Sequence, residues 1–380
     1  MDMLENGNLT EMDNKIATEK TEKKKKVAII LGVIVGLIII CTLFYFLLVR
    51  PMLRKPISEP LALPTIATTQ ISGSEEEATE DTLPIQPPSN LPEIPVFSRP
   101  IVEPDVKPIC GQDAEWLVLM VGIDYRGDDF LYGLADVIRV IRVDFVNMRV
   151  NMVALPRDLI VEAPEDRFRN PDPYKINQAY LFGTPGWDGY LGSGQGAGAL
   201  AEVIQYNFGI PIEHYGVINF ITFIDFIDAI GGVEVDLPGP IAGGFLGDFP
   251  AGKQTLNGER ALALARIRIG YGDTFRVSNQ TLIIRAVLNK LIQPANLVKI
   301  PTLLNQFSGA FLTDLSIEQL GNIGGCFLRN FDNQNLQTFE APADLLNAGS
   351  AFIPTLDNNA FVYRWDQTLV EWIYESLLAE

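Results

Sequence analysis

The sequence predicts an α/β (α+β) sandwich, with a central mixed sheet flanked by helices, in a single extracytoplasmic domain behind one transmembrane helix. Two observations lead to this fold class. Short runs of β-forming residues alternate with segments of helical periodicity from about residue 115 to the end of the chain. One long uncharged apolar run precedes them near the N-terminus.

The apolar run covers residues 27–49 and follows four lysines, Lys23 to Lys26. A hydrocarbon core of roughly 30 Å needs about 20 apolar residues in a helix. No small-residue cleavage site precedes Arg50, which favours a retained anchor over a removed signal peptide. The short tail before the run and the long chain after it predict a single-pass protein of the cell membrane, with a cytoplasmic N-terminus and an extracytoplasmic C-terminal domain.

The segment after the anchor is rich in Pro, Ser, Thr and Glu and lacks apolar periodicity, which is typical of an extended linker. The region beyond residue 294 contains apolar stretches that we expect to pack on the main domain. The predicted organisation is a cytoplasmic tail (1–26), a transmembrane helix (27–49), a linker (50–112), a catalytic domain (113–294) and a C-terminal extension packed on it (295–380).

The strands of the domain are indicated by short apolar runs that end at turn residues. The predicted strands are Trp116–Gly122, Asp136–Asp144 and Val150–Leu155, and the turn at residues 147–149 makes the last two a hairpin. A fourth run alternates and stops at Pro238, as an edge or exposed strand does. Helical periodicity predicts helices at Ala197–Phe208, Phe220–Ile230, Asn257–Arg268, Val277–Ile292 and Trp365–Leu378.

Charge argues against nucleic acid as a partner. Residues 1–55 hold nine Lys/Arg and six Asp/Glu, which gives a net charge of +3. Because the whole chain has a net charge of −18, residues 56–380 have a net charge of −21. A surface this acidic repels a phosphate backbone. The 26-residue tail is too short for a DNA-binding element, which argues against a membrane-bound regulator of transcription.

Cysteine and histidine content narrows the chemistry. Cys41 lies in the predicted span, whereas Cys110 and Cys326 lie beyond it. A bridge between those two would stabilise the fold by roughly 4–5 kcal/mol, but the sequence does not show whether they come within reach. His214 is the only histidine, and no Cys/His metal spacing exists, which argues against zinc chemistry and a Ser–His–Asp triad.

Five polar clusters carry the candidate chemistry. They are Gly122–Arg126, Asp136, Pro156–Asp158, Lys175–Asn177, and a run holding Arg266, Arg268, Asp273, Arg276 and Gln280. Fixed guanidinium groups beside carboxylates are what a protein needs to hold a metal-bound pyrophosphate. For any one arginine, pairing with the surplus surface carboxylates is the favoured explanation, whereas the spacing of the group argues for a shared site.

In their order these clusters resemble the LytR-CpsA-Psr family over about residues 116–291. The resemblance rests on Leu-Val-Leu-Met-Val-Gly-Ile-Asp124-Tyr-Arg126, Asp136, Ala154-Leu-Pro-Arg157-Asp158, Lys175-Ile-Asn177-Gln-Ala-Tyr180, Leu256-Asn-Gly258-Glu-Arg-Ala-Leu262-Ala-Leu-Ala-Arg266-Ile-Arg268 and Asp273-Thr-Phe-Arg276-Val-Ser-Asn-Gln280. One block alone arises by chance, but six or more in order are specific.

The resemblance implies a phosphotransferase that moves a glycopolymer from a polyprenyl-pyrophosphate carrier to peptidoglycan. It places Arg157, Arg266, Arg268 and Arg276 on the pyrophosphate, and Asp124 and Asp136 on Mg²⁺ (or Mn²⁺). Asp158 and Asp273 would orient the arginines or accept a proton from the acceptor. Arg126, Lys175, Asn177 and Gln280 would complete the substrate cleft.

Two positions depart from the family pattern, because Leu134 and Asn279 stand where arginines are usual. Arg126, Arg139 and Arg285 are the candidates to replace the lost cations. Alternatives are a non-catalytic member that binds polyprenyl phosphates or glycans, and a pyrophosphatase-like hydrolase of the carrier. Apolar residues of the helices at 197–208, 220–230 and 277–292 would form either a lipid groove or ordinary core.

Overall fold

The computed structural model describes residues 34–63, 97–98, 107–110, 113–125, 127, 133–169, 173–268, 272–297, 302–303, 307 and 311–380. It divides the chain into two compact units, residues 1–55 and residues 56–380. The expected cytoplasmic tail, residues 1–26, lies outside the described residues.

The first unit contains one apolar helix, Ile34–Leu53, which is long and apolar enough to cross a membrane by length and composition. Its second half includes a π-helical stretch, η1 (Tyr45–Val49), and α2 (Arg50–Leu53). The helix therefore continues four residues beyond Val49, the expected end of the span, and the first residues of that span lie outside the described part.

The second unit is built on the mixed sheet that the sequence predicts. Six strands lie in the order β10-β3-β2-β1-β6-β9. β2 is antiparallel to β1 and β3, while β1–β6 and β3–β10 are parallel pairs and β9 is antiparallel to β6. The bounds are β1 (Glu115–Ile123), β2 (Ala135–Asp144), β3 (Arg149–Ala154), β6 (His214–Ile218), β9 (Leu312–Thr313) and β10 (Leu336–Glu340).

The predicted hairpin is confirmed, since β2 and β3 pair across a tight turn in which Met148 has a positive φ of 53°. The strand expected before Pro238 is β7 (Val233–Leu237), and it lies in a separate two-stranded sheet with β8 (Gly252–Leu256). This small sheet packs with α5, α6 and α7 around a core of its own.

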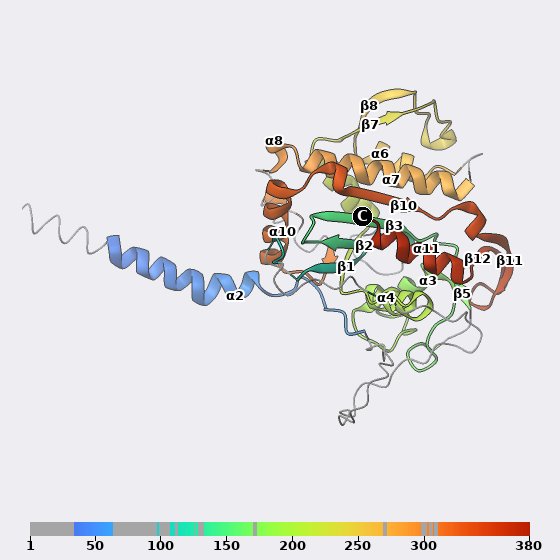
Figure 1. The fold of residues 1–380 in the computed structure, drawn as a ribbon, viewed down its shortest axis with the longest axis horizontal. Helices are drawn as coiled ribbons and strands as arrows, with labels where there is room; N and C mark the ends of the chain where they lie inside the picture. The colour runs from blue at the N-terminus through green and yellow to red at the C-terminus, as the bar shows by residue number, and fades with distance from the viewer. Residues whose placement is uncertain are drawn as a thin grey trace, which may run out of the picture. The chain divides into compact units, whose positions relative to one another are not determined.

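Helices cover both faces of the central sheet (Figure 1). On one face α3 (Ile176–Phe182), α4 (Gln195–Phe208) and α11 (Gln367–Leu378) share the main core with alternate, fully buried residues of β1, namely Leu117, Leu119 and Val121. The other face carries α7 (Gly272–Leu291), which packs with α6 (Gly258–Arg266), and α6 packs with α5 (Phe220–Ala229). The expected α/β sandwich is confirmed.

The segment from residue 294 onward is built into the domain, and two of its strands belong to the central sheet. It supplies β9 and β10, α8 (Pro294–Leu297), α10 (Ile317–Asn330), α11 and the hairpin of β11 (Asn347–Ile353) and β12 (Asn358–Arg364). Single-turn 3-10 helices complete the fold: η2 (Gly244–Leu246), η3 (Asn333–Asn335), η4 (Ala343–Leu345) and η5 (Pro354–Leu356).

Several residues of the expected linker contact the domain. The N–H groups of Ile57 and Ser58 donate to the carbonyls of Leu315 and Thr313 at 3.3 and 2.8 Å. Phe97 is buried in the main core, with its ring against that of Tyr374. A disulfide joins Cys110 to Cys326, with the two Cα atoms 5.6 Å apart, which settles the question that the sequence left open.

Candidate functional site

The polar clusters meet at one end of the central sheet because the strands that carry them end or begin there. Asp124 follows β1, Asp136 is the second residue of β2, and Arg157 follows β3. In an antiparallel pair the end of one strand lies beside the start of its neighbour. Ile123 is accordingly paired with Ala135, which brings Asp124 and Asp136 to the same edge.

Asp124 is held by the backbone of Leu134. The N–H of Asp124 donates to the carbonyl of Leu134 at 3.1 Å, and the N–H of Leu134 donates to Asp124 Oδ1 at 2.7 Å. Burial raises the pKa of the Asp124 carboxyl, the bond from Leu134 opposes this rise, the charge of Asp136 adds to it, and Arg157 opposes it. Both contacts use the backbone of residue 134, so they are present although Leu134 replaces the arginine that the family pattern has there.

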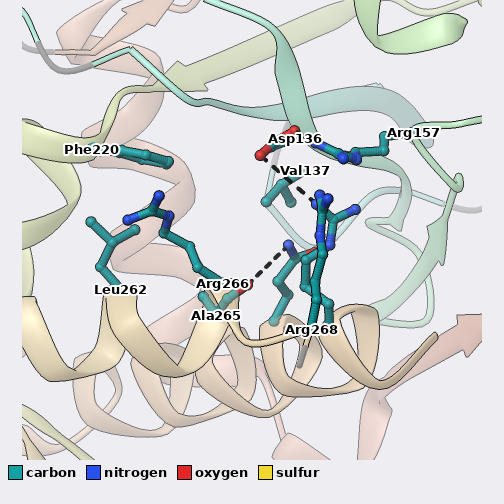
Figure 2. A pocket seen from close by; sticks show the side chains of 10 residues that line it. Asp136, Val137, Arg157, Phe220, Leu262, Ala265, Arg266 and Arg268 are labelled. Atoms are coloured by element: carbon teal, nitrogen blue, oxygen red, sulfur yellow. Dashed lines mark hydrogen bonds and ion pairs between the residues drawn. The ribbon is translucent and has the colours of Figure 1, made fainter. Parts of the chain in front are cut away.

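Asp136 lies between two arginines. Its Oδ1 forms an ion pair with Arg157 Nη1, and its Oδ2 lies 3.8 Å from Arg276 Nη1 (Figure 2). Arg276 is buried, and its guanidinium comes from α7 on the other side of the cavity. Asp136 thus links the sheet to α7 through charge.

Arg157 is supported from behind by Asp158, which is only 5% exposed. Asp158 Oδ1 accepts from Lys175 Nζ at 2.8 Å, and its Oδ2 lies 3.5 Å from Arg157 Nε. Lys175 reaches this point because β4 (Ile160–Val161) and β5 (Tyr174–Lys175) form a short antiparallel pair. The N–H of Asn177 at the start of α3 donates to the Arg157 carbonyl at 3.3 Å.

The cavity in front of these residues is strongly cationic and has a volume of about 260 Å³. Four arginines and one carboxylate line it, and Figure 2 shows their side chains around a common space. The full lining is Asp136, Val137, Arg157, Phe220, Leu262, Ala265, Arg266, Arg268, Arg276 and Gln280. All four arginines that the resemblance places on a pyrophosphate are in this set.

Two lining residues have contacts that fix their place. The guanidinium of Arg266 lies 5.0 Å from the centre of the Phe220 ring, a cation–π contact. Gln280 Nε2 donates to the carbonyl of Ala265 at 3.4 Å. Arg268 follows α6 and is exposed, so its side chain is accessible to a ligand that enters the cavity.

The remaining expected residues that the structure describes lie outside the wall of the cavity. Asp158, Lys175 and Asn177 support Arg157 and are not in the cavity wall. Arg126 lies outside the described residues, and so does the side chain of Asp273.

Asn279 is buried and donates Nδ2 to the carbonyl of Leu264 at 3.4 Å, a contact that joins α7 to α6. Two candidate replacements for the missing arginines do not line the cavity. Arg139 is buried beneath α7, and Arg285 is exposed and donates a hydrogen bond from Nη2 to Thr338 Oγ1 at 2.6 Å.

An apolar groove of about 280 Å³ adjoins the cavity and shares Phe220, Leu262 and Arg266 with it. Its other lining residues come from α5, α6 and η2: Ile221, Ile224, Leu246, Glu259 and Ala263. The apolar side chains of α4, which were candidates for such a groove, belong to the main core instead.

The sequence argument gave Leu262 no role in the site, and it considered Phe220 only as one apolar residue of the helix at 220–230, for a lipid groove or the core; both residues line the cavity and the groove. Phe220 follows Asn219, whose side chain accepts from the Thr222 N–H and caps α5, and Leu262 precedes Arg266 by one helical turn. Those spacings are the signals that would have placed both residues at the site.

Carboxylates are the natural ligands for a divalent ion here. Asp136 is close enough to Asp124 that its charge, in addition to burial, raises the pKa of the Asp124 carboxyl. Within the described residues, no group of three or more His, Cys, Asp or Glu side chains gathers. Two carboxylates fit Mg²⁺, which commonly takes one or two from the protein and the rest of its oxygen ligands from substrate phosphates and water.

Comparison with known proteins gives a consistent result. The profile of the LytR_cpsA_psr family matches residues 98–376. A polyisoprenyl-teichoic acid–peptidoglycan teichoic acid transferase TagU of Enterococcus faecalis is 30% identical over 211 residues, 54% of this chain and 63% of the relative. The corresponding transferase TagV of Bacillus subtilis is 26% identical over 268 residues, 68% of this chain and 63% of the relative.

This chain thus spans just under two thirds of the length of each of these transferases. The crystal structure of B. subtilis TagV superposes with a TM-score of 0.55 at 25% identity and covers 70% of this chain and 96% of the TagV chain. Since the family profile covers more than half of the 380 residues and the fold agrees, the chain belongs to the LytR_cpsA_psr (LytR-CpsA-Psr) family.

Proposed function

We propose that this protein is a membrane-anchored phosphotransferase that moves a glycopolymer from a polyprenyl-pyrophosphate carrier to peptidoglycan with the help of Mg²⁺. The observation that carries the proposal is that a cationic cavity and an apolar groove adjoin each other. A cavity lined by four arginines shares Phe220, Leu262 and Arg266 with an apolar groove. A lipid pyrophosphate has the same two halves, an anionic head and an apolar tail.

The arginines bind the head. A guanidinium meets two phosphate oxygens at once and keeps its charge at any physiological pH. Arg157 and Arg276 approach Asp136 from the sheet and from α7, while Arg266 and Arg268 come from the end of α6. Phosphoryl transfer needs mainly such positioning and charge neutralisation.

Asp124 and Asp136 would hold the divalent ion. When bound, Mg²⁺ supplies positive charge to the phosphate oxygens and relieves the repulsion between the two carboxylates. Asp158 is buried and does not line the cavity, and it meets Lys175 and Arg157, so we assign Asp158 to orient Arg157 rather than to accept a proton. Asp273 remains the candidate proton acceptor in this proposal.

The reaction forms one phosphodiester and breaks one phosphoanhydride. A hydroxyl of the peptidoglycan acceptor loses its proton and attacks the phosphorus that carries the polymer, and polyprenyl monophosphate leaves. The apolar groove retains the tail of the carrier during this step. The helix Ile34–Leu53 keeps the protein at the membrane that contains the carrier, with the domain on the extracytoplasmic side.

The test uses the full chain in detergent micelles with a synthetic polyprenyl-pyrophosphate oligosaccharide and soluble peptidoglycan strands, with and without Mg²⁺. Arg268→Ala removes a cavity arginine, and Arg285→Ala removes an exposed arginine of α7 as the matched control.

Mg²⁺-dependent transfer that is lost in Arg268→Ala and kept in Arg285→Ala supports the proposal. Tight binding of the carrier without turnover would instead favour the non-catalytic binding member. Release of the oligosaccharide to water would favour the hydrolase.

A further inference from the structure

The hairpin β11–β12 has one buried and one exposed face. Ile353 and Val362 point into the main core and are fully buried. The side chains that alternate with them point outward, and Phe352 and Phe361 are 56% and 47% exposed. Two large aromatic rings therefore lie in solvent on a strand pair whose inner face is well packed.

The exposed face forms a neutral aromatic platform. Its six positions, by strand register, are Ala348, Ser350 and Phe352 on β11 and Asn359, Phe361 and Tyr363 on β12, of which Tyr363 is half-buried and also packs against the main core. The rings of Phe361 and Tyr363 meet edge to face with centres 4.9 Å apart. None of the six side chains is charged, although the chain carries a net charge of −18. Large exposed aromatic rings gathered on one face are typical of a binding surface.

The platform is attached to the phosphate site. The N–H of Tyr363 donates to the carbonyl of Asp158 at 2.8 Å, and Tyr363 forms a bridge with Leu159. Asp158 is the residue that supports Arg157. The other end of the hairpin is fixed to α3, because Gln178 Nε2 donates to Thr355 Oγ1 at 3.0 Å. Figure 1 shows the hairpin beyond the end of β10.

The chemistry of this surface matches a carbohydrate. A pyranose ring presents C–H groups on its faces, and these pack on the electron-rich face of an aromatic ring. The hydroxyl groups at its rim need polar partners, and Ser350 and Asn359 supply a hydroxyl and an amide beside the rings. A neutral platform lacks the negative charge with which the rest of this acidic chain would repel the carboxylates of a peptidoglycan strand.

We propose that the outer face of β11–β12 binds the glycan strand of the acceptor and presents its hydroxyl to the phosphate site. This inference rests on the proposed transferase function, because it assigns a place to the second substrate. Phe352 and Phe361 stack on successive sugar rings, and Ser350 and Asn359 bond their hydroxyl groups.

The test measures binding of soluble glycan strands, released from peptidoglycan by digestion, to the full chain in detergent micelles. Phe352→Ser and Phe361→Ser each remove one ring of the platform. Phe245→Ser is the matched control, since Phe245 is 87% exposed in η2 and lies outside the hairpin. We expect each platform variant to weaken glycan binding at least tenfold and the control to bind as the wild type does.

Equal binding by all four proteins would overturn the proposal, as would equal weakening in the control. A platform that holds a second copy of the chain would appear as a loss of dimers in Phe361→Ser by light scattering, with glycan binding unchanged, which also refutes it. Thermal melting of each variant shows that the fold is retained.

The inference and the proposed function fail in different ways. Affinity for the polyprenyl-pyrophosphate carrier is measured in the same variants and should stay unchanged, while the KM for the acceptor rises and kcat at saturating acceptor is kept. If the wild type transfers the polymer but binds glycan no more tightly than Phe361→Ser does, the proposed function is supported and the glycan-binding role of the platform is refuted. If the wild type binds glycan through Phe361 but does not transfer the polymer, the glycan-binding role is supported and the proposed function is refuted.

Discussion

Arg139 of β2 donates Nη2 to the backbone carbonyl of Val277 in α7 at 3.3 Å. The same nitrogen lies 3.4 Å from Thr281 Oγ1. Val277 and Thr281 directly follow Arg276 and Gln280, two residues of the cavity wall. Arg139 is only 1% exposed, so this buried contact fixes the part of α7 that carries them relative to the strand that carries Asp136.

The first prediction concerns this contact. Burial lowers the pKa of Arg139 to about 10, Glu340 opposes the shift and Arg276 adds to it, so the group is still charged at neutral pH. Arg139→Met should weaken binding of the carrier by about tenfold because α7 loses its buried hydrogen bonds to Arg139 of β2. The melting temperature should change little, since an apolar side chain of similar length replaces a buried charge. Calorimetric titration and thermal melting measure both quantities.

Arg139→Lys is the conservative control, because lysine keeps the charge and one donor toward Val277. It should retain most of the affinity. Wild-type affinity in Arg139→Met would show that Arg276 and Gln280 need no support from β2.

The second prediction concerns Asp124. Its raised pKa means that the folded protein favours the protonated carboxyl, so ionisation at neutral pH costs stability, and this cost disappears as pH falls through the raised pKa. Asp124→Asn keeps an acceptor for the Leu134 N–H. The variant should melt above the wild type at pH 7, and the difference should shrink toward about pH 4. Mg²⁺-dependent transfer should fall by about 10²-fold or more.

Asp136→Asn is the contrasting variant. The Asp136 carboxylate meets both Arg157 and Arg276, so its loss removes the negative charge that lies between these two guanidinium groups. The melting temperature should fall at neutral pH, by the equivalent of about 1–3 kcal/mol. A rise in both variants would contradict the assigned charge balance.

The third prediction concerns Lys175. Lys175→Met removes the closer cation from the buried Asp158 carboxylate and should cost about 2–3 kcal/mol of the free energy of unfolding. Urea unfolding measures this loss. Lys253→Met, at an exposed position of β8, should stay within about 0.5 kcal/mol of the wild type.

Adding Asp158→Asn to Lys175→Met tests the cause. If the loss comes from an uncompensated buried charge, the double variant should recover part of the stability. No recovery would mean that the lysine stem, rather than its charge, supports the β4–β5 pair.

The fourth prediction concerns the disulfide. The bridge joins residues 216 positions apart, so its removal by Cys110→Ser and Cys326→Ser should cost roughly 4–5 kcal/mol in the chain-entropy picture. The Ile109 N–H donates to the carbonyl of Phe145, just beyond the end of β2 that is remote from Asp136. Affinity for the carrier should therefore be unchanged at temperatures where the variant is folded. Denaturant unfolding with and without reductant measures the loss, and weaker binding by the folded variant would contradict this view.

The sequence by itself determined the elements and most of the site. Strand ends, turn residues and helix periodicity are local signals, and each polar cluster follows or opens one element. Antiparallel pairing of neighbouring strands then forces Asp124 and Asp136 to one edge. The arginines at 157, 266, 268 and 276 were assigned through the family resemblance, whose motifs are local in the sequence, and all four line the cavity.

Only the tertiary structure decided which distant residues meet. The Cys110–Cys326 bridge, the entry of β9 and β10 into the sheet and the attachment of Ile57 to Leu315 join segments that share no periodic pattern. The bond from Asn279 to the Leu264 carbonyl and the position of Arg139 beneath α7 also depend on contacts between distant segments. Whether a polar side chain lines a cavity or supports its wall depends on which element packs against it, and long-range packing leaves no local trace in the sequence.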